Sequence, residues 1–196
     1  DDLTSLRAAL AACREHPGSV LTVPPGAYHI SDPQALALEE RALSGQLGDN
    51  PERVIFRPYY PHVKGLDFAG CQDVTVRAEQ ATFWVHGWME PISLRQCQGI
   101  TLQGLTLDMA VRPFSEGWII QADADGLTVS LKPDAPLRPG TPAPRCFLYD
   151  PERRRFGGED LGVQGIKWLG ARRVRLRVDR PRARAGQGVV DRKSVV

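Results

Sequence analysis

Three carboxylates lie close to aromatic residues in the middle of the sequence, and they define chemistry that it could perform. They are Glu90, Asp108 and Glu116. Hydrolysis of a glycosidic bond with inversion uses two carboxyl groups about 6.5–9.5 Å apart, one protonated to assist the leaving group and one ionised to activate water. Asp108 and Glu116 are the candidates for such a role, and the alternative is that each binds backbone amides in a turn. The sequence alone therefore leaves the catalytic residues unknown.

Aromatic and planar polar side chains surround these acids. The aromatic candidates are Trp84, Trp88, Phe114 and Trp118, and the polar candidates are His86 and Arg112. Rings that are apolar on their faces, placed beside a few polar groups, are typical of ligand sites. We expect Trp88, Arg112 and His86 to contact a substrate. The alternatives are a salt bridge or coil-to-coil hydrogen bond for Arg112 and a structural hydrogen bond for His86. Trp84 lies in an apolar alternation, so either it or its neighbours face the core.

An internal repeat organises the middle of the chain. Residues 66–76 align without a gap on residues 92–102, an offset of 26 residues that places a Cys-Gln pair in each copy. Each copy holds two short runs in which apolar and polar residues alternate, which is strand spacing. Short strands that repeat every twenty-odd residues are typical of a β-solenoid, whose coils stack through parallel strands about 4.8 Å apart. We therefore expect Val74 to lie over Ile100 in a continuous interior.

An amphipathic helix is predicted before the repeat. Apolar residues follow helical spacing over residues 3–13, Asp2 or Thr4 is placed to cap the first turn, and Pro17-Gly18 ends the helix. The end of a stack of strands exposes unpaired edges and apolar interior, which a terminal cap must cover. We expect the helix to be that cap and residues 20–30 to be the first coil.

The elements between the first coil and the repeat, and those after it, are less regular. Residues 35–43 predict a short helix inserted in an early coil, and residues 54–56 predict a strand. Residues 118–122 and 127–131 alternate and flank an Asp-Ala-Asp-Gly turn, which predicts a hairpin. Residues 133–144 contain five prolines and predict a loop.

These elements together predict an all-β fold, a right-handed parallel β-helix (solenoid) with an N-terminal capping helix and a small antiparallel β insertion. The expected boundaries are 1–117 for the cap and first coils, 118–180 for the insertion and 181–196 for an artefactual or disordered tail. Residues 191–196 match the translation of a common short-read sequencing adapter, so the gene is expected to continue beyond them. The alternative is a genuine polar tail.

Composition narrows the partners. The 196 residues carry a net charge of +2, and the basic excess lies late in the chain without interleaved aromatics, so no nucleic-acid partner is expected. No apolar run approaches the ~20 residues of a membrane span, so no membrane partner is expected. The four cysteines form no C-x-x-C pair, so we expect buried thiols and no metal site. Phosphate-loop, dinucleotide and zinc-protease motifs are absent from the sequence, and no cofactor is expected.

A family resemblance adds to this interpretation. Residues 1–30, a helix followed by a strand and a Pro-Pro-Gly turn, resemble the opening of pectin-lyase-like β-helix proteins. Residues 83–91, 96–102 and 107–117 look like the α-1,3-galactosidase type of β-helix glycosidase (glycoside hydrolase family 110). The likeness covers about residues 1–120, and the Asp-Met-Ala-Val segment that begins at Asp108 departs from the more acidic and aromatic pattern expected there.

The resemblance implies an extracellular or periplasmic enzyme that cleaves terminal α-galactose with inversion and without a cofactor, although the sequence shows no signal peptide. It also implies that the catalytic acids lie on later coils, so this chain alone is expected to be inactive. Carbohydrate is the expected partner. Two alternatives stay open: a polysaccharide lyase or epimerase of the same architecture, and a non-catalytic structural solenoid such as an adhesin or phage tail module.

Overall fold

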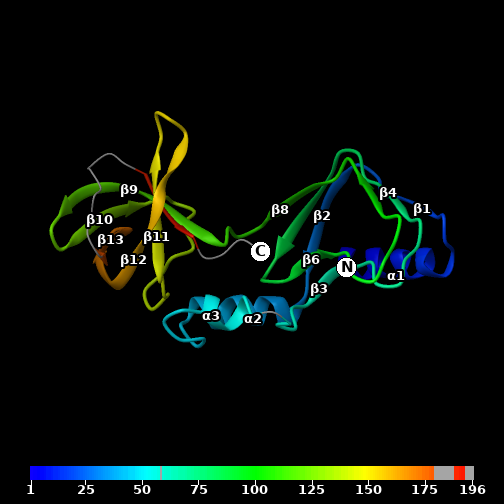
Figure 1. Ribbon diagram of the computed structural model, residues 1–196, viewed down its shortest axis with the longest axis horizontal. Helices are drawn as coiled ribbons and strands as arrows, with labels where there is room; N and C mark the ends of the chain where they lie inside the picture. The colour runs from blue at the N-terminus through cyan, green and yellow to red at the C-terminus, as the bar shows by residue number, and fades with distance from the viewer. Residues whose placement is uncertain (58, 179–187, 193–196) are drawn as a thin grey trace. The chain divides into compact units, whose positions relative to one another are not determined.

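The computed structural model describes residues 1–57, 59–178 and 188–192, which divide into two compact units (Figure 1). The first unit comprises Asp1–Glu40 and Pro61–Val111 and contains only parallel strand pairs. The second comprises Arg41–Tyr60 and Arg112–Val196, and all its strand pairs are antiparallel. Each unit has its own apolar core. The chain is thus mostly β, as predicted, with few helices.

The first unit begins with α1 (Asp2–Glu15), the predicted amphipathic helix. Its buried side chains are Leu3, Leu6, Leu10 and Cys13, which follow the helical spacing. The predicted N-cap was wrong: Asp1 caps the helix, because its Oδ1 accepts the N–H of Leu3 at 3.0 Å. The helix ends before Gly18, whose φ of 84° a residue with a side chain rarely adopts.

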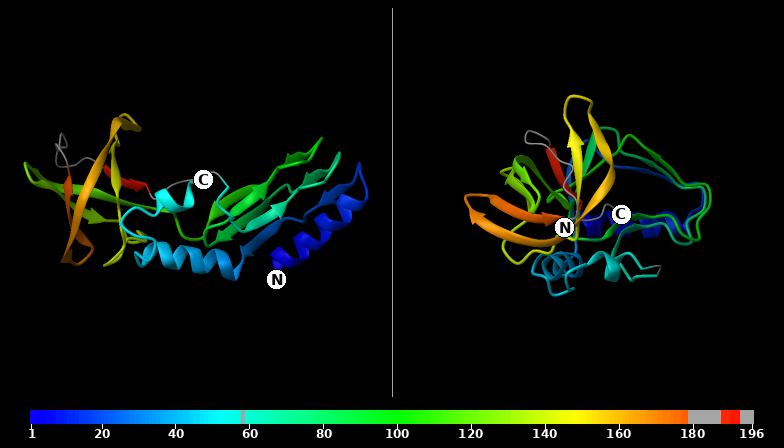
Figure 2. Two further views of the ribbon diagram at one scale, coloured as in Figure 1. Left: turned by 60° about the horizontal axis from the view of Figure 1, so that its bottom comes forward. Right: turned by 60° about the vertical axis from the view of Figure 1, so that its left-hand side comes forward.

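Eight short strands follow and pair in parallel as three sheets. The first sheet joins β1 (Val20–Thr22), β4 (Thr75–Arg77) and β7 (Thr101–Gln103); the second joins β2 (Gly26–Ser31), β5 (Ala81–His86) and β8 (Thr106–Met109); the third joins β3 (Lys64–Asp67) and β6 (Glu90–Ser93). Thr75 lies opposite Thr101 and Val76 opposite Leu102, so the predicted offset of 26 residues is confirmed as strand register. Successive turns of the chain overlie one another in the right-hand view of Figure 2.

The burial of this unit changes from one row of strands to the next. In the middle row, Phe83 and Val85 are 1% exposed, and Val74 is completely buried. In the last row, the apolar residues Ile100, Leu102, Leu105 and Met109 are only partly buried. Leu107, which lies opposite Phe83, is 44% exposed. The core is therefore closed beneath β5 and open along β8.

Helix α1 covers the opposite end of the unit by bonding strand edges. Arg7 Nη2 donates to the carbonyl oxygen of Lys64 at 2.5 Å, and Arg14 Nε donates to that of Ala69 at 2.7 Å. The N–H of His29 donates to the carboxylate of Asp2 at 2.7 Å. Backbone groups at an unpaired strand edge would otherwise have to bind water or another chain. The helix thus satisfies edge groups of β2 and of the segment around β3.

Two helices lie between β2 and β3. α2 (Pro33–Leu43) confirms the helix predicted over residues 35–43. The strand predicted over residues 54–56 was wrong, because these residues belong to or follow α3 (Glu52–Ile55). Pro51 is the N-cap of this helix, and its φ of −60° and ψ of −25° already lie in the helical region that the proline ring permits. A run of three apolar residues has no periodicity that separates a strand from a helix turn.

The described residues of the second unit form a closed six-stranded barrel. Its strands are β9 (Phe114–Asp123), β10 (Gly126–Leu131), β11 (Arg145–Asp150), β12 (Arg155–Gly170), β13 (Arg173–Val178) and β14 (Gly188–Arg192), joined in the order β10-β13-β12-β11-β14-β9. The predicted hairpin is confirmed, since Leu127 lies opposite Ala122 and Ser130 opposite Trp118. Strand β14 lies within the predicted tail, and residues 181–187 and 193–196 of that tail lie outside the described residues.

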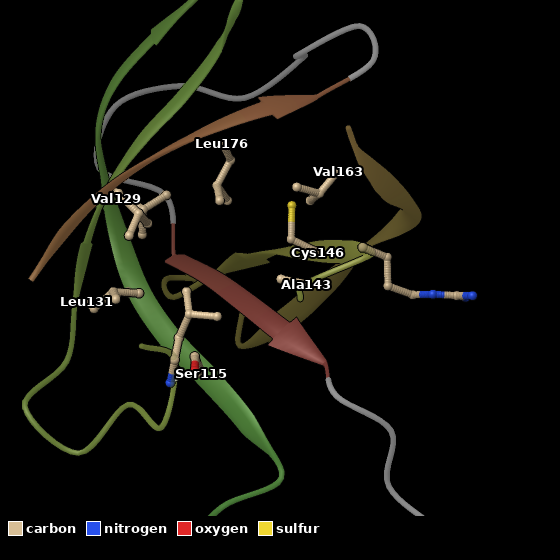
Figure 3. A pocket seen from close by; sticks show the side chains of 11 residues that line it. Ser115, Val129, Leu131, Ala143, Cys146, Val163 and Leu176 are labelled. Atoms are coloured by element: carbon tan, nitrogen blue, oxygen red, sulfur yellow. Dashed lines mark hydrogen bonds between the residues drawn. The ribbon is translucent and has the colours of Figure 1, made fainter. Parts of the chain in front are cut away.

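Side chains fill the interior of the barrel. Figure 3 shows Val129, Cys146, Val163 and Leu176 pointing into it from different strands. They leave a cavity of only about 10 Å³, close to the smallest volume that holds one water molecule. The barrel interior is therefore core rather than a ligand site.

Candidate functional site

The outer face of the sheet β2-β5-β8 carries the densest group of sugar-binding candidates in the first unit. Side chains alternate along β5, so Phe83 and Val85 point into the core while Trp84 and His86 point outward and stay half-buried. This alternation resolves the choice that the sequence left open for Trp84. The indole is on the surface of the sheet, where a ligand can reach it.

Parallel register brings further polar groups to the same face. His29 on β2 and Asp108 on β8 lie on either side of Trp84 and directly opposite it. Ser31 lies opposite His86. Neighbouring strands are about 4.8 Å apart, so His29, Trp84 and Asp108 form a continuous row. We call the group His29, Trp84, His86 and Asp108 the Trp84 face.

A hydrogen bond joins the two histidines of the Trp84 face. His29 Nδ1 and His86 Nε2 are 2.8 Å apart, and the ring centroids are separated by 5.1 Å. One nitrogen donates and the other accepts, so at least one of the two rings is neutral in this arrangement. The backbone N–H of His29 is also held by Asp2 of α1. The pair therefore fixes the ring orientations beside the indole.

Asp108 is the only one of the three carboxylates first considered that belongs to the Trp84 face. It is exposed, and its Oδ1 accepts the N–H of Met109 at 2.8 Å. That bond orients the carboxylate but leaves the second oxygen available to a hydroxyl donor. The carboxylate lies on the edge strand β8, open to solvent, where a ligand hydroxyl can reach it. Its position suits binding better than acid catalysis.

Trp88 and Glu90 lie further along the chain in the same unit. Trp88 is half-buried, and its backbone N–H donates to Ala35 of α2 at 3.0 Å. Gly87 allows this approach: its φ is 78°, and a Cβ there would come within 2.5 Å of the backbone of Ala35. Glu90 lies on β6 and forms an ion pair with Arg95 at 3.7 Å.

Arg112 and Glu116 belong to the barrel unit and form an ion-pair cluster there. Arg112 Nη1 lies 3.3 Å from Glu116 and 3.2 Å from Asp134, and Lys132 Nζ lies 2.5 Å from Glu116. Glu116 therefore forms ion pairs with two cationic side chains, those of Arg112 and Lys132. Such engagement suits a structural role at the start of the barrel, which is the salt-bridge alternative considered for Arg112.

The aromatic candidates Phe114 and Trp118 also lie in the barrel, on β9. Trp118 is 45% exposed, whereas Phe114 is half-buried. The described residues thus bring together His86, Trp84 and Asp108, and place Arg112, Glu116 and both β9 aromatics in another unit.

His29 was not among the residues that the sequence predicted for a site. It lies 55 residues before Trp84 in the register of the sheet, an offset that α2 and α3 lengthen beyond the repeat of 26. The only signal was its position inside a predicted strand, which showed that it alternates with the core residue Ile30. Lys132 and Asp134 were missed because a barrel pairing, and no sequence period, brings Lys132 to Glu116 and Asp134 to Arg112.

The chain is similar over part of its length to curated α-1,3-galactosidases. The chain is 24% identical over 134 residues to alpha-1,3-galactosidase B of Bacteroides thetaiotaomicron, a match that covers 64% of this chain and 19% of that protein. It is 28% identical over 108 residues to alpha-1,3-galactosidase A of Bacteroides fragilis, covering 54% of this chain and 16% of that protein. No family model matches the chain.

These matches support a distant relation between part of this chain and α-1,3-galactosidases. The matched stretch spans less than a fifth of the length of these curated relatives. Among the described residues, no helix has both the length and the apolar character needed to cross a membrane.

Proposed function

We propose that this chain is the N-terminal part of a carbohydrate-active enzyme built on a right-handed parallel β-helix, and that the enzyme is a glycoside hydrolase of terminal α-galactosides. The relation to two kinds of α-1,3-galactosidase over more than half of the chain is the observation that carries the proposal. An extracellular or periplasmic location belongs to the same proposal.

The strand pattern supports the β-helix part of the proposal. Three sheets of parallel strands recur in the same order along the chain, and the register of β4 with β7 and of β3 with β6 reproduces the repeat of 26 residues. Helix α1 bonds strand edges at one end, while the apolar row at β7 and β8 is only partly buried at the other. Partly buried apolar rows are what a further stacked coil would cover.

The mechanism that we propose uses two carboxyl groups and inverts the anomeric configuration. Asp108 is exposed, Glu90 is paired with Arg95, and Glu116 is bound to two cations, so none of the three candidates has the setting expected of the general acid. We therefore propose that segments beyond the described coils supply the catalytic pair. The Trp84 face would contribute sugar contacts, with the indole as a stacking surface and Asp108 and the histidines as hydroxyl partners.

The test is an activity comparison between the 196-residue chain and the product of the gene read beyond codon 190. We expect the longer protein to release galactose from an α-1,3-linked galactobiose, and NMR of the first product to show the β anomer. The chain itself should release none. Hydrolysis by the chain alone would contradict the placement of the acids.

The same assay separates the alternatives. Release of an unsaturated uronate from oligogalacturonate by the longer protein would replace the hydrolase with a lyase. Failure on both substrates, with the protein folded, would favour the non-catalytic solenoid.

A further inference from the structure

A groove on the outside of the barrel unit has no role in the proposed catalysis. Its volume is about 620 Å³, within the range of roughly 300–1,000 Å³ that is usual for small-ligand sites. Three segments line it: the loop at 44–49 after α2, the loop at 140–144, and residues 163–166 together with Trp168 of β12. The groove is much larger than the cavity of about 10 Å³ inside the barrel.

Specific contacts hold the two loops in place. Thr141, which is 5% exposed, donates its hydroxyl to the carbonyl oxygen of Leu43 at 2.8 Å. Gly45 has a φ of 77°, and a Cβ there would lie 3.2 Å from the carbonyl oxygen of Gly140. The N–H of Gly48 donates to the carbonyl oxygen of Gly45 at 2.9 Å, closing a tight turn. The groove is thus formed before any ligand arrives, which lowers the entropic cost of binding.

A salt-bridge arrangement anchors the same segment to the barrel. Arg145 on β11 lies 3.0 Å from Glu52 of α3 and 3.1 Å from Asp160 on β12. The polypeptide that follows the 44–49 loop is therefore tied to two neighbouring strands of the barrel.

The side chains of the groove combine an aromatic ring with neutral and acidic polar groups. Trp168 is half-buried and packs partly against the barrel core, so part of the indole remains in the groove. Ser44, Asp49 and Gln164 add a hydroxyl, a carboxylate and an amide. Within the described residues, the lining includes no lysine or arginine.

This set of groups selects among ligand classes. Phosphate, sulfate and uronate ligands carry negative charge and are normally bound by arginine or lysine. A carboxylate instead accepts hydrogen bonds from hydroxyls, and an amide both donates to hydroxyls and accepts from them. An indole face covers the apolar face of a sugar ring. The groove chemistry therefore matches a neutral polyhydroxylated ligand.

We infer that this groove is a second carbohydrate-binding site, which takes a neutral oligosaccharide with Trp168 as its stacking surface and Asp49 as a hydroxyl acceptor. The choice of galactoside as ligand rests on the proposed function. The site itself belongs to the barrel and binds without cleaving, so it would hold the enzyme on a glycan that the catalytic coils process.

The experiment titrates the 196-residue chain with α-1,3-galactobiose and follows the four tryptophan indole N–H signals by NMR, each assigned through a Trp→Phe variant. We expect the Trp168 signal to shift in a saturable way. Trp168→Ala should weaken that binding about tenfold or more, as loss of a central aromatic contact commonly does. Asp49→Ala, a change in an exposed loop, should weaken it several-fold. Trp118→Ala is the matched control, because Trp118 is 45% exposed on the same barrel and does not line the groove.

The signals of Trp168 and Trp84 test the groove and the Trp84 face separately. Shifts at Trp84 without any at Trp168 would keep the Trp84 face and overturn the groove. Shifts at Trp168 without any at Trp84 would support the groove and count against the Trp84 face. Binding of oligogalacturonate in preference to the galactobiose at Trp168 would overturn the assignment of a neutral ligand. If Trp168→Ala does not fold by circular dichroism, Trp168→Phe and Asp49→Ala carry the test, and unchanged affinity in both would overturn it.

Discussion

The two units of the chain solve the problem of strand edges in opposite ways. The parallel unit depends on neighbours at its ends: α1 bonds the edges at one end, and the row at β8 remains partly open. The barrel closes on itself, because β9 pairs with both β10 and β14 and no strand in the described ring lacks a second partner. Closure removes edges outright, whereas a stack only moves them to its ends.

This difference in strand edges determines which changes should destabilise each unit. The core of the parallel unit becomes less buried from the middle row of strands to the last, so its stability depends on what lies over the last row. The barrel core includes residues from β9, β10, β11 and β13, so no single row is exposed. A substitution in the core of one unit should therefore leave the stability of the other unit unchanged.

The largest effect is expected from Phe83→Ala. Phe83 is 1% exposed in the middle row, and removing a buried phenyl group costs about 3–5 kcal/mol of unfolding free energy. Hydrogen exchange should show lost protection in β4 and β5 and unchanged protection in β9 and β10, because the two cores share no residue. Ile119→Ala in the barrel should give the reverse pattern. Loss of protection in both units together would contradict the independence of the two cores.

A smaller effect is expected at the open row. Leu107→Lys and Ile120→Lys change residues of similar exposure, 44% on β8 and 48% on the barrel strand β9. We expect the Leu107 variant to reduce self-association of the chain several-fold in sedimentation velocity, because a lysine on an edge strand opposes strand addition. The Ile120 variant should leave self-association unchanged. In the longer protein that we propose, a further coil over β8 would bury the charge, and Leu107→Lys should instead destabilise it.

The covered end should respond less strongly. Arg14 Nε and Nη2 donate to the carbonyl oxygens of Ala69 and Asp67 at 2.7 and 3.0 Å. Because water can replace these partly exposed bonds, Arg14→Ala should cost on the order of 1 kcal/mol in thermal unfolding of the parallel unit. Arg14→Lys keeps the charge but lacks the planar group that reaches two carbonyls, so it should recover only part of the loss. Full recovery by lysine would assign the effect to charge alone.

The smallest effects should appear at opposite ends of the pH scale. Burial raises the pKa of the Cys13 thiol above its ordinary 9.0, and the nearby Cys71 raises it further. The folded parallel unit then holds this proton more tightly than the unfolded chain, so the contribution of Cys13 to stability should be complete below its ordinary pKa of 9.0 and fall as the pH rises through the higher folded pKa. Cys13→Ala should flatten that slope in denaturant unfolding measured from pH 7 to 10.

The barrel should show the acidic counterpart. The side-chain hydrogen bond from Arg175 holds the pKa of Asp123 below its ordinary 3.8. The small contribution of this pair is therefore present above that value and lost as the pH falls through the lower folded one. Asp123→Asn should remove the slope from the melting temperature of the barrel between pH 5 and 2, and added salt should shrink it because the carboxylate is exposed.

The sequence predicted what local periodicity encodes. The 26-residue offset appeared as strand register, the spacing of apolar residues located α1 and α2, and a Gly-containing turn located the β9-β10 hairpin. Each of these signals lies within one element or one repeat. The helix at Glu52–Ile55 was mistaken for a strand because its apolar run is too short to show a period.

Long-range pairing accounts for what the sequence did not predict. The barrel was expected only as a small insertion, because closure depends on β14 meeting β9 some 70 residues earlier, as in the pairing of Val190 with Glu116. The Trp84 face was predicted in part, through Trp84, His86 and Asp108. Its fourth member, His29, lies opposite Trp84. The inserted helices lengthen the offset between these two residues, so the 26-residue repeat does not predict their pairing.

The closure of the barrel has a consequence for how such a chain is assembled. The chain enters the barrel at Phe114 and reaches Arg192 directly opposite that residue, on the adjoining antiparallel strand. The first residue of β9 and the last residue of β14 are therefore neighbours in the barrel. A module with adjacent entry and exit can be spliced into a continuous run of repeating turns without disturbing the spacing of the turns on either side.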